Sequence, residues 1–136
     1  MAHALMLGAR ILLPGVIDEG RRLIQALQAS QFEFDAAFWL FGEESERWKM
    51  IIATPLYDRE GPIKAYSRFT PICDVMDPPL RIDTTDVALE GRGDRLVKAL
   101  RKRFDFKHAK DDKALERDVV DREHIEAAYL YQLSEI

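Results

Sequence analysis

Two aromatic-rich apolar runs flank a short polar segment between residues 32 and 55. The first run reads FEFDAAFWLF, the polar segment is GEESER, and the second run is WKMIIATP. Two such runs joined by a few polar residues and a glycine predict a β-hairpin. Both faces of the first run are apolar, since Phe38 and Leu40 alternate with Trp39 and Phe41. We therefore expect this strand in the middle of a sheet that helices cover on both faces.

Three helices are predicted from apolar residues that recur at three- and four-residue spacing. The first runs from Val16 to Ala29. The second begins at Pro62, after a loop over residues 56–61, and the third follows Asp94, which is placed to cap it. The expected buried faces are Val16, Ile17, Leu23, Ile24 and Leu27 in the first helix, Ile63, Tyr66 and Phe69 in the second, and Leu96, Val97, Leu100 and Phe104 in the third.

Two further strands complete the predicted fold. One covers residues 80–89, and the alternation of apolar and polar residues over 125–133 predicts the other. A helix is the alternative at this second place, because Ile125, Tyr129 and Leu133 are four residues apart. The polar stretch 105–118 is expected to form a surface loop or a short helix. The sequence thus predicts one α+β domain over residues 1–136, with a mostly antiparallel four-stranded sheet, about three helices and the order α-β-β-α-β-α-β.

The composition indicates the cellular compartment of the protein more clearly than its activity. The chain has 136 residues, a formal net charge of -4 and a single cysteine, Cys73, which excludes an internal disulfide and suits a reducing compartment. The N-terminal segment has no basic stretch before its apolar run, and Arg10 interrupts that run, so we expect no signal peptide. No apolar stretch reaches the roughly 18 residues that a membrane span needs. We expect a soluble, cytoplasmic protein that does not bind a membrane.

Part of the chain resembles a pattern found in small bacterial proteins of unassigned function. The resemblance rests on AAFW at 36–39, Trp48, IATP at 52–55, and the residues Asp58, Gly61, Pro62, Ala65 and Tyr66 that follow. The ending AAYLY at 127–131 is similar as well. The resemblance implies a compact α+β domain, and it carries over no catalytic residue.

No arrangement of residues typical of an enzyme or a metal site stands out. The histidines His3, His108 and His124 are far apart in the sequence, and Cys73 has no CxxC partner, so we expect no metal and no cofactor. The chain has neither a GxSxG elbow nor a P-loop. Glu46 and Lys49 resemble the acid and lysine of a metal-dependent nuclease site. Residues three apart on a strand point to opposite faces, so these two side chains cannot converge on one metal. We predict no catalytic residue.

A basic stretch runs from residue 92 to residue 107, with seven basic and two acidic residues. Arg95, Lys98, Arg101 and Lys102 fall on the face of the predicted helix opposite its apolar residues. This surface could bind nucleic-acid phosphates, and the four residues are the candidate nucleic-acid site. The alternative is a solvated helix face that forms ion pairs with acidic residues just downstream, at positions 111, 112 and 116.

The loop before the second helix is the candidate site for a small anion or phosphate ligand. It follows a strand and precedes a helix, whose first N–H groups attract negative charge. The candidate ligand-binding residues are Thr54, Tyr57, Asp58 and Arg59. In the alternative interpretation Asp58 and Glu60 occupy the anion's place as caps of the helix.

The leading functional hypothesis is a non-catalytic domain that acts through protein contacts and self-associates as a homodimer. It rests on a surplus of aromatic residues over what a core of this size can enclose, because unburied apolar area tends to mark an interface. The aromatic residues in question are Phe32, Phe34, Phe38, Trp39, Phe41, Trp48, Tyr57, Tyr66, Tyr129 and Tyr131.

We expect different degrees of burial for the two tryptophans of the predicted hairpin. Trp39 is expected to be buried against the first helix near Leu23 or Leu27. Trp48 is expected to be partly exposed at the start of the second strand. The two should lie diagonally across the hairpin, not directly opposite one another.

Overall fold

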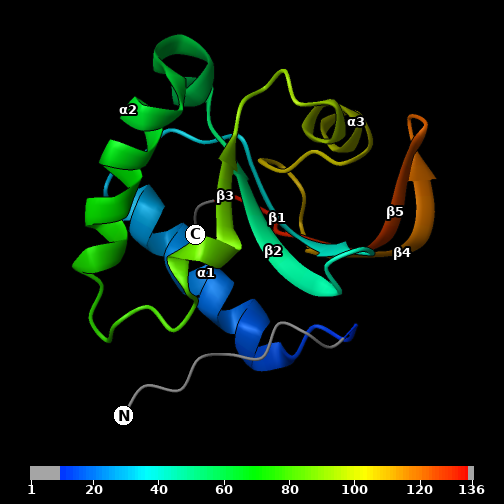
Figure 1. The fold of residues 1–136 in the computed structure, drawn as a ribbon, viewed down its shortest axis with the longest axis horizontal. Coiled ribbons are helices and arrows are strands. Elements are labelled where there is room, and N and C mark those ends of the chain that lie inside the picture. The colour runs from blue at the N-terminus through cyan, green and yellow to red at the C-terminus, as the bar shows by residue number, and fades with distance from the viewer. Residues whose placement is uncertain (1–9, 135–136) are drawn as a thin grey trace.

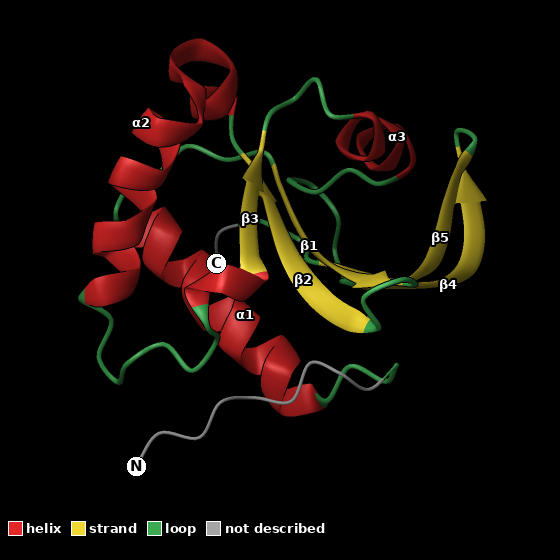
Figure 2. Cartoon of the chain, in the orientation of Figure 1, coloured by secondary structure: helices red, strands yellow, loops and turns green. Residues whose placement is uncertain are grey.

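A single five-stranded sheet with helices packed on it forms the fold in the computed structural model, which describes residues 10–134 (Figures 1 and 2). The α+β class expected from the sequence is confirmed. The elements, in chain order, are α1 (Pro14–Ala29), β1 (Ala36–Gly42), β2 (Arg47–Ala53), α2 (Pro55–Asp74), a short 3-10 helix η1 (Thr84–Asp86), β3 (Val87–Glu90), α3 (Arg95–Arg103), β4 (Lys113–Val120) and β5 (Glu123–Leu130).

The sheet has the strand order β3-β2-β1-β5-β4, so β1 lies at its centre as expected. β1 pairs antiparallel with both β2 and β5, and β4 pairs antiparallel with β5. β3 runs parallel to β2, because α2 connects them and returns the chain to the same end of the sheet. The sheet is therefore mixed, although most of its pairs are antiparallel.

Helices cover both faces of β1, and the two faces differ in how they are filled. On one face Trp39 donates a hydrogen bond from Nε1 to the hydroxyl of Tyr131 at 2.8 Å, and that hydroxyl donates to the carbonyl of Ile17 in α1 at 2.7 Å. On the other face the ring of Phe38 lies 6.3 Å from the ring of Phe106, which follows α3. Figure 1 shows α1 and α3 on opposite sides of the sheet.

Gly20 lets α1 approach the sheet closely enough for the hydrogen bond between Trp39 and Tyr131. A Cβ atom at this position would overlap the Tyr131 hydroxyl and would lie 2.9 Å from Nε1 of Trp39. Both aromatic side chains are completely buried, and the guanidinium of Arg21 lies 4.9 Å from the centre of the Tyr131 ring. Burial raises the pKa of Tyr131 far above its ordinary value, so the hydroxyl stays protonated and keeps donating.

The expectations for the tryptophans are partly confirmed. Trp39 is buried and its Nε1 faces α1 at Gly20, while a contact with Leu23 or Leu27 stays a prediction. The diagonal placement is confirmed, because Trp39 pairs with Met50 and Trp48 pairs with Phe41. The expected exposure of Trp48 is wrong: it is 3% exposed, and the ring of Phe41 packs edge-on against it at 5.4 Å.

The second helix begins earlier than the sequence predicts. α2 starts at Pro55, so the expected loop over 56–61 is helical up to a kink at Gly61, whose φ of 87° is readily adopted only by glycine. After the kink the buried positions are Ala65, Phe69 and Cys73, spaced four apart. Ile63 was expected in the buried stripe, but it is 85% exposed because it lies two residues before Ala65, about 200° around the helix from the buried positions.

The strands differ from the prediction in number and length. The expected strand over 80–89 is reduced to β3, and the closing strand, for which a helix was the alternative, is confirmed as β5. The sequence analysis missed β4, which lies in and beyond the stretch 105–118 expected to be a loop or helix. β4 is an edge strand that buries only Leu115 and Val120, and charged residues dominate the rest, as is common at sheet edges.

Replacement of Gly20 by alanine tests the close approach of α1 to the sheet. The added methyl group must displace the Tyr131 hydroxyl or move the helix, so we expect Gly20→Ala to lower the free energy of unfolding by about 1–3 kcal/mol. Urea denaturation followed by tryptophan fluorescence measures this change.

Gly15 provides the matched control, because it lies in the same helix with no atom within 4 Å of a Cβ built there. Gly15→Ala should leave the free energy of unfolding within about 0.5 kcal/mol of the parent value. Equal effects of the two substitutions would contradict the role given to Gly20.

Candidate functional site

The sheet face that carries Phe38 is covered by α3 over only part of its area. Phe38 is completely buried, whereas Leu40 on the same strand is half-buried. Strand pairing places Lys49, Ile51 and Ala88 on this same face, because Leu40 pairs with Lys49, Phe38 with Ile51, and Ile51 with Ala88. Ile51 and Ala88 are half-buried and Lys49 is exposed. We call Leu40, Lys49, Ile51 and Ala88 the open sheet face.

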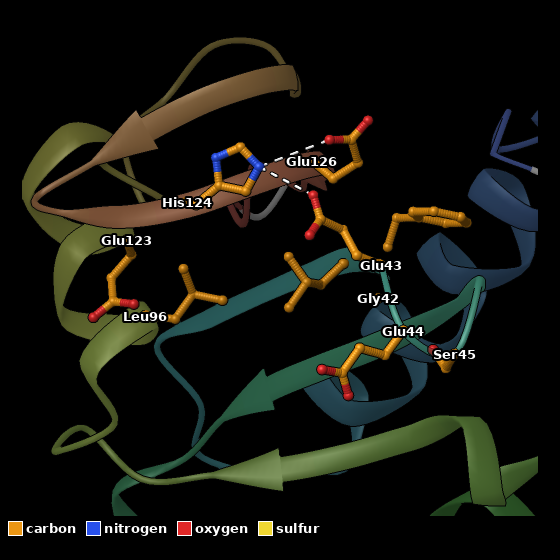
Figure 3. A pocket seen from close by; sticks show the side chains of 10 residues that line it. Gly42, Glu43, Glu44, Ser45, Leu96, Glu123, His124 and Glu126 are labelled. Atoms are coloured by element: carbon orange, nitrogen blue, oxygen red, sulfur yellow. Dashed lines mark hydrogen bonds and ion pairs between the residues drawn. The ribbon is translucent and has the colours of Figure 1, made fainter.

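Two adjoining hollows lie along this region, and both include Leu40, Gly42 and Ser45. The first, the apolar hollow, has a volume of about 390 Å³ and is further lined by Arg47, Trp48, Lys49, Ile51, Thr85 and Asp86. The second, the acidic hollow, measures about 450 Å³ and lies between the β1–β2 turn, α3 and β5 (Figure 3). Its remaining lining residues are Phe41, Glu43, Glu44, Leu96, Glu123, His124 and Glu126.

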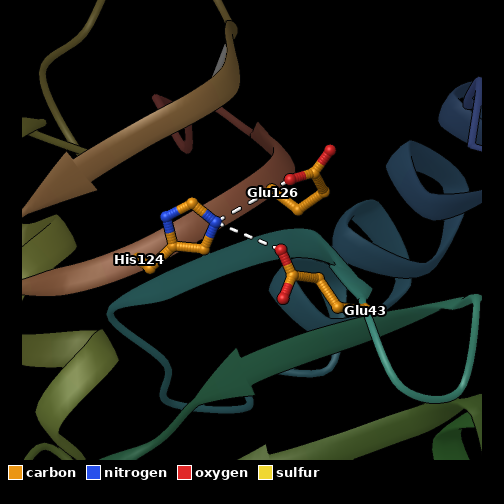
Figure 4. Close-up of side chains that lie close together, drawn as sticks. All are labelled: Glu43, His124 and Glu126. Carbon is orange, nitrogen blue, oxygen red and sulfur yellow. Dashed lines mark hydrogen bonds and ion pairs between the residues drawn. The ribbon is translucent and has the colours of Figure 1, made fainter.

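Three side chains with ligand atoms converge in the acidic hollow (Figure 4). Nε2 of His124 lies 3.1 Å from Oε1 of Glu43 and 3.7 Å from Oε2 of Glu126. His124 and Glu126 are two residues apart on β5 and so point to the same side of the strand, while Glu43 follows β1 directly. One ligand atom from each residue lies within 4.8 Å of the other two, an arrangement that can hold a cation.

Arg10 holds Glu126 in place from the segment before α1. Its Nε and Nη2 donate to Oε1 of Glu126 at 3.0 and 2.8 Å, and Nη2 also donates to the Glu126 carbonyl at 3.2 Å. The hydrogen bonds from Arg10 lower the pKa of Glu126 below its ordinary value, although burial opposes the shift. Glu126 therefore stays ionised, with Oε1 occupied by Arg10 and Oε2 nearer to His124.

This group was not expected from the sequence, because the spacings between histidines and cysteines alone do not indicate it. A strand assigned at 123–130 makes His124 and Glu126 neighbours on one face, so two of the three residues could have been grouped from the sequence. Glu43 joins them only because β5 pairs with β1, and nothing local in the sequence indicates that pairing.

The residues of the predicted ligand-binding loop lie close together. The side chains of Thr54, Asp58 and Arg59 already have partners within the protein. Thr54 is buried; its hydroxyl donates to the carbonyl of Glu33 at 2.7 Å and accepts from the Leu56 N–H, so it caps α2. Asp58 accepts a hydrogen bond from the N–H of Arg92 at 2.8 Å, and Arg59 pairs with the Glu33 carboxylate at 3.1 Å.

Tyr57 is half-buried beside this group. The alternative expected Asp58 and Glu60 to cap this helix, but Thr54 caps it. Glu60 instead lies 3.7 Å from Arg68. Binding of a small anion by Thr54, Tyr57, Asp58 and Arg59 stays a prediction.

A buried carboxylate lies next to this loop and was not expected from the sequence. Asp35 is 4% exposed, with Nε of Arg92 at 2.7 Å from Oδ2 and Nζ of Lys107 at 3.3 Å from Oδ1. Burial by itself would raise the pKa of Asp35, but the hydrogen bonds from the two cations outweigh it and lower the pKa below its ordinary value. Asp35, directly before β1, is thus linked by ion pairs to one residue before α3 and one residue after it.

The predicted basic surface is present on α3, and neighbouring carboxylates neutralise part of it. Arg95 lies 3.4 Å from Glu123, and Lys102 lies 3.1 Å from Asp121. Lys98 and Arg101 are exposed, and neither forms an ion pair among the described residues.

The acidic partners of α3 come from the β4–β5 hairpin and not from residues 111–116, which were expected to supply them. Asp112 instead pairs with Arg21, and Glu116 pairs with Arg10. A role in nucleic-acid binding for Arg95, Lys98, Arg101 and Lys102 stays a prediction.

The other reactive side chains considered in the sequence have ordinary surroundings. Cys73 is buried, and burial together with the nearby Asp74 raises the pKa of its thiol to about 11, so it is a poor nucleophile. His108 is exposed and pairs with Asp105 at 3.0 Å. His3 lies outside the described residues.

Comparison of the chain with protein-family models, curated proteins and solved structures finds no match. The resemblance to small bacterial proteins of unassigned function therefore stays a prediction. Within residues 10–134, no helix has both the length and the apolar character required to cross a membrane.

Replacement of Arg92 by alanine tests how Asp35 is stabilised. Within residues 10–134, the variant leaves the buried carboxylate with Lys107 as its one cationic partner, so we expect a lower free energy of unfolding at neutral pH. A carboxyl with a lowered pKa stabilises the fold above its unfolded pKa, and that contribution disappears as the pH falls through the folded pKa. The difference between parent and variant should therefore narrow below about pH 4, the ordinary aspartate range. Urea denaturation at several pH values measures it.

Arg59→Ala is the control, because it removes an arginine from an ion pair with Glu33 in which both side chains are more than half exposed. Exposed pairs contribute at most about 1 kcal/mol, so this variant should differ little from the parent at any pH. A difference for Arg92→Ala that stays constant into acid would show that Asp35 is not the group it stabilises.

Proposed function

We propose that this protein is a non-catalytic interaction domain that binds a protein partner at the open sheet face. The observation that carries the proposal is the apolar hollow, where the half-buried side chains of Leu40 and Ile51 border solvent beside the exposed Lys49. A hollow lined by apolar side chains offers a partner's side chain both burial and shape complementarity.

Charge favours a partner with a carboxylate next to an apolar side chain. Within the apolar hollow Arg47 lies 3.3 Å from Asp86 and so already has a partner. Lys49 forms no ion pair with any described residue. An incoming segment that buries an apolar side chain against Ile51 can place an Asp or Glu beside Lys49, and the opposite charge gives the contact its specificity.

The edges of the sheet favour binding on a face over addition of a strand. At the β3 edge the hydroxyl of Tyr66, in α2, accepts the hydrogen bond from the Leu89 N–H at 3.0 Å. At the β4 edge Arg117 has a positive φ of 45°, and most of the exposed side chains are charged. Both features discourage pairing with another strand.

Self-association as a homodimer stays a prediction. The surplus of unburied aromatic residues that suggested it is smaller than expected. All ten aromatic residues that suggested an unburied surplus are buried or half-buried within the single chain. Six are buried and four are half-buried, so one copy of the chain covers most of this aromatic surface.

Nucleic-acid binding is the second candidate function. Lys98 and Arg101 favour it, because both are exposed cations without ion-pair partners among the described residues. The ion pairs of Arg95 and Lys102 with the β4–β5 hairpin weaken it, since those cations are already partly neutralised. We also propose a cytoplasmic setting for either function, because the single cysteine, Cys73, suits a reducing compartment.

Peptides selected from a random display library against the full chain test the proposed surface. We expect enriched peptides to combine an apolar residue with Asp or Glu. Lys49→Glu should weaken their binding at least tenfold, and Ile51→Ala should weaken it less, because it removes only part of the apolar contact. Fluorescence polarisation with labelled peptides measures both effects.

Matched controls are available on α2, where Lys64 and Ile63 are both exposed. Lys64→Glu and Ile63→Ala should leave peptide affinity unchanged. Failure to enrich any peptide, or equal losses in the α2 variants, would contradict binding at the open sheet face.

A further inference from the structure

The acidic hollow has the composition of a cation site. The hollow and the ion pairs around it contain five carboxylates and three guanidinium groups, so negative charge prevails when histidine is neutral. The carboxylates are Glu43, Glu44, Glu116, Glu123 and Glu126, and the guanidinium groups are those of Arg10, Arg95 and Arg117.

The ligand atoms at its centre are already close to the spacing that a bound metal needs. Two ligands bonded to one zinc ion at about 2.0–2.2 Å are separated by roughly 3–3.5 Å. Nε2 of His124 is 3.1 Å from Glu43 and 3.7 Å from Glu126. Glu43 and His124 are exposed, so rotation of these two side chains can bring their ligand atoms and Oε2 of Glu126 around one ion.

Arg10 supplies a feature found around metal sites. Metal-binding carboxylates are usually held by hydrogen bonds to their second oxygen, which fixes their orientation. Arg10 donates two hydrogen bonds to Oε1 of Glu126, so Oε2 is the oxygen left for a metal. Arg10 therefore fixes the orientation of the Glu126 carboxylate, which distinguishes it from a carboxylate that rotates freely at the surface.

We propose that Glu43, His124 and Glu126 bind one divalent transition-metal ion of the zinc class. One imidazole and two carboxylates suit zinc, whereas calcium and magnesium prefer oxygen ligands alone. Glu43 and His124 have side chains 60% and 56% exposed, so the site is open to solvent and a water molecule can complete the coordination. This site does not depend on the protein partner proposed for the open sheet face.

The competing account is a cluster of ion pairs in which His124 simply bridges two carboxylates. A second His–carboxylate pair in the same protein separates the two accounts. His108 lies 3.0 Å from Asp105, is also exposed, and belongs to no group of three potential ligands among the described residues.

Zinc titration of the full chain, followed by competition with a chromophoric chelator, tests the proposal. All proteins carry His3→Ala, so that a histidine near the amino terminus does not contribute. We expect one zinc ion per chain, and at least a tenfold loss of affinity in both His124→Ala and Glu43→Gln. His108→Ala should bind as the background protein does.

Cobalt provides a second readout, because a site with bound nitrogen and oxygen ligands alters its visible absorption and His124→Ala should abolish that change. Circular dichroism verifies that each variant is folded. Zinc affinity that is equal in the background protein and His124→Ala, or that falls equally in His108→Ala, would overturn the metal site and leave the ion-pair cluster as the explanation.

Discussion

The hydrogen-bonded contact of Trp39 with Tyr131 and α1 is the interaction on which the rest of the structure depends. It joins the central strand, the segment that follows β5 and the first helix at one point, and its polar atoms are hydrogen-bonded within the buried core. Gly20 makes the contact possible by bringing the helix backbone close to both aromatic side chains. With this face of the sheet covered by long helices, the other face is left to α3.

The size of α3 explains why part of that second face stays open. α3 has nine residues, and a helix about 10 Å wide covers roughly two strand spacings of about 4.8 Å. Phe106, which follows α3, covers Phe38 on β1, while Ile51 on β2 and Ala88 on β3 stay half-buried. The open sheet face and the acidic hollow therefore arise from one cause, and they meet at Leu40.

Features encoded by local pattern were predictable from the sequence. The hairpin, α1, α3 with its Asp94 cap, and the central place of β1 all follow from periodicity and turn residues. β4 was not predictable, because an edge strand with two buried residues has almost no apolar alternation. The early start of α2 was hidden by Gly61 and Pro62, which read as a helix boundary and in fact form a kink.

The candidate sites were harder to predict than the fold, because they depend on pairings between distant segments. Asp35 meets Arg92 and Lys107 across 57 residues or more, and His124 meets Glu43 across 81. Neither contact leaves a spacing signal in the sequence. The proposed partner surface depends in addition on what α3 fails to cover, which is a property of the assembled sheet.

Amide hydrogen exchange with and without a bound selected peptide tests the central claim, that the part of the sheet left open by α3 is the binding surface. The account predicts that binding slows exchange in residues 40–51 and 85–90, with no change along the exposed side of α2 or in β4. Slowed exchange confined to α2, to β4 or to the basic face of α3 would contradict it.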